Sequence, residues 1–183
     1  PSNGRDHMWR SLALALLSVA FIDVPLASAE DAAGPPRSDV RSAIEKALPL
    51  LEKCSAGSAK QRKCFTCHNQ ALPVFALAQA KKQGFAVDEE DLKLQIKHTL
   101  AHLERGKKNY LAGKGQGGKA DTAGYGLWTL EAGDWKPDET TAAVTEYLLQ
   151  WHKDFDHWKL SSVRPPMEAS DFTTTYLALR SLG

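Results

Sequence analysis

The sequence lacks a strong excess of charge of either sign. Its 183 residues include 23 Lys and Arg and 22 Asp and Glu, which gives a formal net charge of +1. The basic residues form no stripe, and neither a P-loop nor a dinucleotide-binding fingerprint is present, because the glycine-rich residues 113–119 follow no strand pattern. These absences argue against a nucleic-acid partner and against the common nucleotide-dependent enzymes.

The sequence also lacks a hydrophobic run long enough to cross a membrane. The apolar run of residues 11–22 falls short of the roughly 20 residues that a membrane-spanning helix needs. Small residues at Ala27 and Ala29 match a signal-peptidase site, with cleavage before Glu30. We therefore expect residues 1–29 to be a signal peptide with some upstream residues, and the mature protein to be periplasmic or secreted, without a stable membrane span.

No credible strand pattern follows this segment, which favours an all-α protein. Residues 30–37 are predicted to be a disordered lead-in, and residues 38–183 a helical domain. Apolar residues at spacings of three and four, together with caps such as Ser38 and Ser170, define the expected helices. These are residues 38–54 with a kink or break near Pro49, 69–84, 88–107, 121–133, 136–153 and 170–183, with a polar connector at residues 55–63 and a glycine-rich loop at 109–120.

Two of these segments resemble each other. "DTAGYGLWTL" and "SDFTTTYLAL" begin about 49 residues apart, a period typical of repeats of paired helices. Gly124 and Gly126 in the first segment indicate close helix packing. Such repeats bury their faces against neighbours. We therefore expect helical hairpins, with further repeats beyond Gly183.

Cysteine is scarce, and its number is odd. Two of the three cysteines, Cys64 and Cys67, precede His68 in the pattern C-x-x-C-H. Covalent attachment of c-type haem needs two thiols that add to the vinyl groups and a histidine beside the second thiol to bind the iron, and this motif supplies both. The sequence therefore predicts haem c, with His68 as the proximal iron ligand.

Other roles for these residues remain open. Cys54 can form a disulfide with Cys64 or Cys67, or it can be a small buried apolar residue in a helix. Cys54, Cys64, Cys67 and His68 offer the four ligands of a zinc site. A redox-active C-x-x-C is disfavoured because it belongs to a βαβ context that this helical chain lacks.

A second axial ligand of the iron has three candidates. His98 and His102 lie four residues apart, on one face of a predicted helix. Met167 lies in the predicted turn "RPPMEA". We expect His98 or His102 first and Met167 second, and a five-coordinate iron is the remaining possibility.

The second half of the chain resembles the α/α-toroid superfamily of squalene-hopene cyclases and prenyltransferase β subunits. In that family a Gln-x-x-x-Gly-x-Trp turn ties paired helices. Here Trp158 matches the Trp, whereas His152 and Asp156 replace Gln and Gly. The segments "RPPMEASDFTTT" and "CHNQALP" are similar to segments of cyclase-like bacterial proteins, so the resemblance covers roughly residues 40–183.

The resemblance implies part of an α/α toroid, but it does not assign catalytic residues. The cyclase signature is an Asp-x-Asp-Asp cluster, and the only acidic cluster here, "DEED" at residues 88–91, is explained by capping at a helix start. The zinc-binding Asp, Cys and His of the prenyltransferases are not visible. Aromatic side chains line the toroid cavity in the family, although helical spacing here favours core packing for most of them.

Three functions follow from these observations. The leading one is an exported, cyclase-like helical protein with covalent haem c, acting in electron transfer with a redox partner or in haem-dependent sensing. The second is a non-catalytic helical-repeat binding module stapled by a disulfide. The third is a relative of the terpenoid cyclases and prenyltransferases that acts on an apolar polyprenyl molecule.

Overall fold

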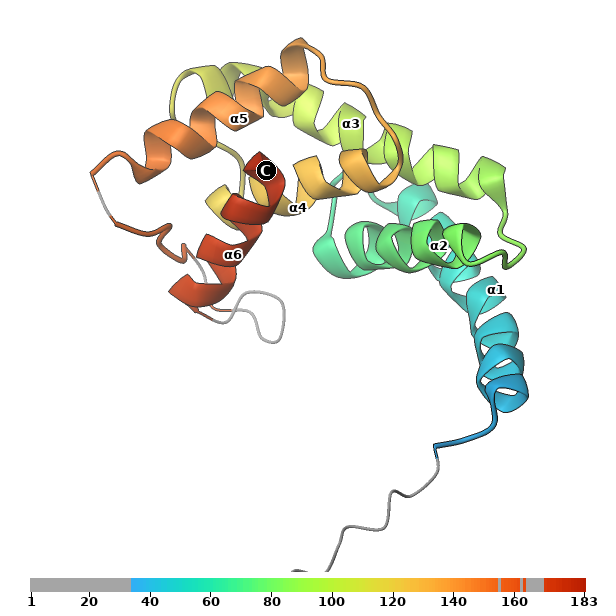
Figure 1. The fold of residues 1–183 in the computed structure, drawn as a ribbon. Coiled ribbons are helices and arrows are strands. Elements are labelled where there is room, and N and C mark those ends of the chain that lie inside the picture. The colour runs from blue at the N-terminus through green and yellow to red at the C-terminus, as the bar shows by residue number, and fades with distance from the viewer. Residues whose placement is uncertain (1–33, 155, 162, 164–169) are drawn as a thin grey trace, which may run out of the picture. The chain divides into compact units, whose positions relative to one another are not determined.

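A computed structural model describes residues 34–154, 156–161, 163 and 170–183 of the chain. The predicted signal peptide lies outside these residues, as does Met167. The chain divides into two units between Pro35 and Pro36, and the fold below is that of Pro36–Gly183. Its described residues contain helices and no strand, so the all-α prediction is confirmed (Figure 1). The helices are α1 (Arg37–Gln61), the π-helical segment η1 (Cys67–Ala71), α2 (Leu72–Lys82), α3 (Glu89–Leu111), α4 (Lys119–Ala132), α5 (Glu139–His152) and α6 (Asp171–Leu182).

The helices pack in two series. Helix α3 contacts both α1 and α5, whereas α4 contacts both α2 and α6. Figure 1 shows α2, α4 and α6 in a row, beneath α3 and α5. Successive helices α3–α4 and α4–α5 also touch, so the hydrophobic core lies between the two series.

Helix α1 differs most from the sequence prediction. It begins at Arg37 after the extended Pro36, and Ser38 is not its cap. It passes through Pro49 without a break and continues to Gln61, so the predicted connector at residues 55–63 is helical over most of its length. The cause is a tertiary contact. The hydroxyl of the fully buried Ser55 donates to Asp91 Oδ2 of α3 at 3.2 Å, which holds this polar part of α1 in place.

The starts of α3 and α6 match the sequence prediction closely. The Asp88 carboxylate accepts hydrogen bonds from the backbone amides of Glu90 and Asp91, so the predicted capping role of the "DEED" segment is confirmed. Ser170 caps α6 as expected. Helix α5 is capped by Asp138, so Pro137 precedes the cap and does not occupy the first helical turn.

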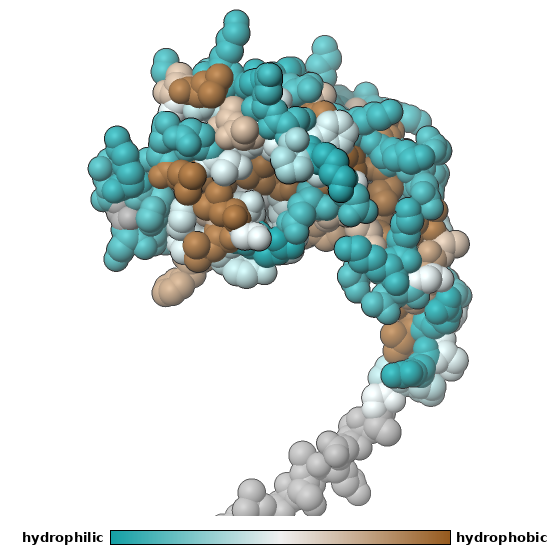
Figure 2. All heavy atoms as spheres, turned by 45° about the horizontal axis from the view of Figure 1, so that its top comes forward, coloured by the Kyte–Doolittle hydropathy of each residue, from teal (hydrophilic) through white to brown (hydrophobic). Residues whose placement is uncertain are grey.

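Glycines bring α4 close to its neighbours, as the sequence predicted. A Cβ on Gly124 would lie 3.1 Å from the Leu177 backbone of α6, and one on Gly126 would lie 3.0 Å from the Leu103 side chain of α3. Hydrophilic side chains cover most of the face seen in Figure 2, with smaller hydrophobic areas between them.

The turn between α5 and α6 contains a buried tryptophan. The indole Nε1 of Trp158 donates to the Leu148 carbonyl of α5 at 2.9 Å, and its backbone amide donates to the Thr175 hydroxyl of α6 at 3.1 Å. His152 stacks on the Trp158 ring with 4.1 Å between ring centroids. Trp158 therefore links the two helices.

Candidate functional site

The C-x-x-C-H segment leads into the short π-helix η1, which begins at Cys67 and directly precedes α2. Thr66 caps it, because its hydroxyl accepts a hydrogen bond from the Asn69 amide. The fully buried Gln70 holds the turn from inside, since its Oε1 accepts from the Thr66 amide at 2.8 Å and from the Thr66 hydroxyl at 2.9 Å. Pro73 lies in the first turn of α2, which continues directly from η1. The motif therefore has a defined backbone.

The reactive groups of the motif differ in their exposure to solvent. Cys64 has an exposed free thiol, and His68 is exposed. Cys67 is half-buried, and its Sγ lies 4.0 Å from His68 Nδ1. Two accessible thiols beside an exposed imidazole match the chemistry of covalent haem attachment, so the residues present fit that group.

An apolar cluster borders Cys67. Its buried members belong to the motif, α4 and α6, and the partly buried Cys67, Phe75 and Trp128 pack against it. The buried members are Phe65, Ala71, Tyr125 and Leu177. Phe75 stacks on Trp128 with 4.2 Å between ring centroids, and Trp128 meets Tyr176 edge-on at 6.2 Å. A row of aromatic rings thus runs from α2 across α4 to α6, and two of its rings pack against the same apolar cluster as Cys67.

Helix α3 contacts the other side of the motif. His98 Nε2 lies 3.2 Å from the Cys64 carbonyl oxygen, and the Arg105 guanidinium donates to the Lys63 carbonyl. The His102 ring lies 6.0 Å from the Phe65 ring. The structure therefore brings both histidine candidates for the second iron ligand next to the motif.

The two histidines differ in environment. Burial lowers the pKa of His102 to about 4, and the nearby positive charges of Arg105 and His98 add to the effect. His102 is therefore a neutral imidazole at neutral pH, the form that binds a metal. In the structure, a ring nitrogen of His98 is already engaged by the Cys64 carbonyl. Met167, the third candidate, lies outside the described residues.

The remaining cysteine does not match its expected role. Cys54 is exposed on α1, so the prediction of a small buried residue is wrong. It is a free thiol and forms no disulfide with Cys64 or Cys67 in the structure. Within the described ranges, no three His, Cys, Asp or Glu side chains lie close enough to hold one metal ion, so the four residues of the zinc alternative are not gathered.

Sequence reasoning missed Gln70, Arg105 and Asp91. Gln70 and Arg105 support the motif, and Asp91 joins α1 to α3 by accepting from Ser55 and from Gln95 Nε2 at 3.0 Å. The roles of Arg105 and Asp91 leave no local signal, because their partners Lys63 and Ser55 lie 42 and 36 residues away in the sequence. The role of Gln70 depends on its burial, which the local sequence does not show.

No protein-family model, curated protein or solved structure matches the chain. Among the described helices, none is both long and apolar enough to cross a membrane.

Proposed function

We propose that the protein is an exported helical protein in which Cys64 and Cys67 bind haem c covalently and His68 binds its iron. The observation that supports this most directly is the arrangement of the motif: the exposed thiol of Cys64 precedes a short, well-anchored helical turn that carries the half-buried Cys67 and the exposed imidazole of His68. When bound, the haem supplies one-electron transfer or ligand-dependent sensing.

The residues around the motif have separate roles in this proposal. Gln70 and Thr66 fix the turn that presents the two thiols and the imidazole. Phe75 and Trp128 give the Cys67 side an apolar surface that excludes water. His102, neutral and half-buried beside the motif, is the better candidate for a second iron ligand, and His98 positions the Cys64 backbone.

The proposed fold is part of an α/α toroid. The alternation of contacts, α1–α3–α5 in one series and α2–α4–α6 in the other, is the pattern expected of stacked helical hairpins. The Trp158 turn between α5 and α6 supports the same arrangement, because it ties the end of one hairpin helix to the next. The Arg180–Glu131 ion pair of 2.7 Å joins positions in α6 and α4 that are 49 residues apart, close to the repeat period seen in the sequence.

Export and haem attachment are tested together. The full chain is expressed in a host that has the c-type haem maturation machinery, and a denaturing gel is stained for haem. We expect a haem-positive band in the periplasmic fraction that disappears in Cys64→Ser and Cys67→Ser.

Cys54→Ser is the matched control, since Cys54 is an exposed cysteine outside the motif. It should retain the haem. A colourless wild-type protein whose thiols titrate only after reduction would contradict the proposal and favour the disulfide-stapled binding module.

A further inference from the structure

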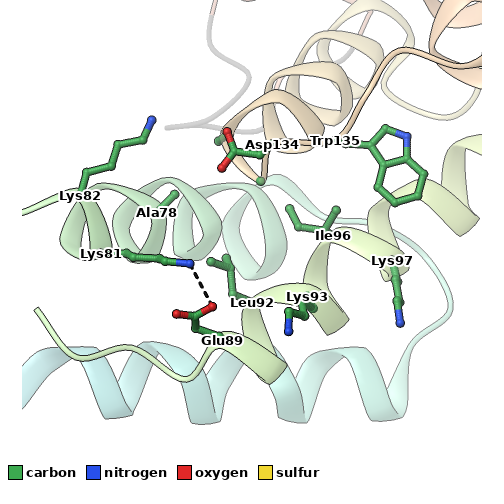
Figure 3. A pocket seen from close by; sticks show the side chains of 12 residues that line it. Ala78, Lys81, Lys82, Glu89, Leu92, Lys93, Ile96, Lys97, Asp134 and Trp135 are labelled. Carbon is green, nitrogen blue, oxygen red and sulfur yellow. Dashed lines mark ion pairs between the residues drawn. The ribbon is translucent and has the colours of Figure 1, made fainter. Parts of the chain in front are cut away.

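A groove lies between α2, the first half of α3 and the end of α4, apart from the C-x-x-C-H motif. It encloses about 430 Å³, which lies within the size range of small-molecule sites. Figure 3 shows Lys81 of α2 and Glu89 of α3 meeting along one side, with Asp134 and Trp135 on the other. The groove is thus built by the consecutive helices α2 and α3 together with the end of α4 and the residues that follow it.

The floor of the groove is apolar. Ala78, Leu92 and Ile96 line it, and each is at most 9% exposed. Ile96 fills the space above Gly133 so closely that a Cβ there would lie 2.1 Å from Ile96 Cδ1. The Trp135 indole is held in place, because its Nε1 donates to the Asp138 carboxylate at 2.9 Å. The floor is therefore preformed and offers hydrophobic surface to a ligand.

The rim of the groove is basic. Four lysines line it, against the two carboxylates of Glu89 and Asp134. The lining lysines are Lys81, Lys82, Lys93 and Lys97. Lys81 is paired with Glu89 at 3.0 Å and Lys93 with Glu90 at 2.7 Å. Within the described part of the chain, Lys97 has no carboxylate partner, and it lies four residues from Lys93, on the same face of α3.

We propose that this groove binds a free long-chain carboxylate, whose hydrocarbon chain lies on the apolar floor and whose head is held by Lys97 with Lys93 beside it. The four lysines exceed the carboxylates of Glu89, Glu90 and Asp134 by one positive charge, which favours an anionic head, and the apolar floor favours a hydrocarbon chain. The enclosed volume suits a single small molecule, and a helical peptide would need a longer surface. The assignment is independent of haem, since the residues that line the groove do not include those of the motif.

The test uses laurate below its micelle concentration and the full chain, with binding measured by calorimetry and by tryptophan fluorescence. Dodecyl maltoside, with the same chain and a neutral head, and butyrate, with the head and a short chain, are the comparison probes. We expect saturable binding of laurate and no saturable binding of dodecyl maltoside or butyrate. We expect Trp135→Phe to remove the fluorescence change while calorimetry still detects binding.

Lys97→Ala is expected to weaken laurate binding about two- to fivefold, the usual size of one exposed charge interaction. Lys108→Ala is the matched control, because it removes an exposed lysine of α3 that does not line the groove, and it should bind as the wild type does. Equal binding of laurate and dodecyl maltoside, an equal loss in both lysine variants, or binding to anionic vesicles in place of monomeric laurate would overturn the proposal. So would an absence of laurate binding in folded protein.

Discussion

Replacing Gly124 by Ala should loosen the contact between α4 and α6. A Cβ at this position would lie 3.1 Å from both the carbonyl carbon and the carbonyl oxygen of Leu177, and 3.2 Å from its Cβ. Most of these are backbone atoms of a helix, so they cannot move aside as a flexible side chain does. Crowding of this kind costs about 1–3 kcal/mol. Alanine recovers about 1 kcal/mol through its higher helix propensity, so we expect a net loss of about 1 kcal/mol in the free energy of unfolding.

Gly57→Ala is the matched control, since Gly57 also lies within a helix but has no atom within 4 Å of its Cβ position. Only the propensity effect remains there, and the variant should be more stable by about 0.5–1 kcal/mol. Urea denaturation followed by far-ultraviolet circular dichroism measures both values. If Gly124→Ala is stabilised as much as Gly57→Ala, α4 and α6 are not packed as described.

Three further predictions concern the buried imidazole of His102, the Trp158 turn and the Asp88 helix cap. Burial lowers the pKa of His102 to about 4, so the folded state favours the neutral form of this side chain. In haem-free protein, His102 should not reduce the free energy of unfolding above the unfolded pKa of about 6.5. As the pH falls from 6.5 to 4, the free energy of unfolding should drop by about 1–2 kcal/mol, after allowing for partial exposure. Urea titrations should show no such loss in His102→Gln, and an equal pH dependence in both proteins would refute the assignment. Trp158→Phe removes the hydrogen bond to the Leu148 carbonyl. The free energy of unfolding, measured by urea denaturation, should fall by at least about 1 kcal/mol. An unchanged free energy of unfolding would mean that the turn does not link α5 and α6. Asp88→Ala should lower the free energy of unfolding by about 1 kcal/mol, whereas Asp88→Asn should lose less, and equal losses in the two variants would argue against capping.

Local signals in the sequence predicted much of the fold. The starts of α3 and α6 were identified because Asp88 and Ser170 are followed by apolar residues at helical spacing, and capping depends on neighbours within one turn. The close approach of α4 to α3 and α6 was predicted from Gly124 and Gly126, because glycine inside a helix pattern usually has a packing reason.

The errors arose where a distant contact overrides local preference. Residues 55–61 are polar and read as a connector, yet they are helical because Ser55 is held by Asp91, 36 residues further along the chain. The exposure of Cys54 follows from the face that α1 turns to solvent, and that face was assigned wrongly when the helix was expected to end there.

For the candidate site, too, local spacing could be read from the sequence, whereas contacts that depend on the fold could not. The C-x-x-C-H motif is defined by local spacing, so Cys64, Cys67 and His68 could be predicted as a haem site from sequence alone, and this assignment stays a prediction. The position of His98 against the Cys64 carbonyl depends on how α3 crosses the motif. The sequence predicted His98 as a candidate iron ligand, but it did not predict this contact. Gln70 was missed altogether, because its role depends on being buried.

The most direct test of the central proposal is a pyridine haemochrome spectrum of the protein purified from a host with the c-type haem maturation machinery. The proposal predicts one covalent haem per chain, retained in Cys54→Ser and absent from Cys64→Ser. Haem-free protein from that host, folded by circular dichroism and identical in absorbance to Cys64→Ser, would contradict it.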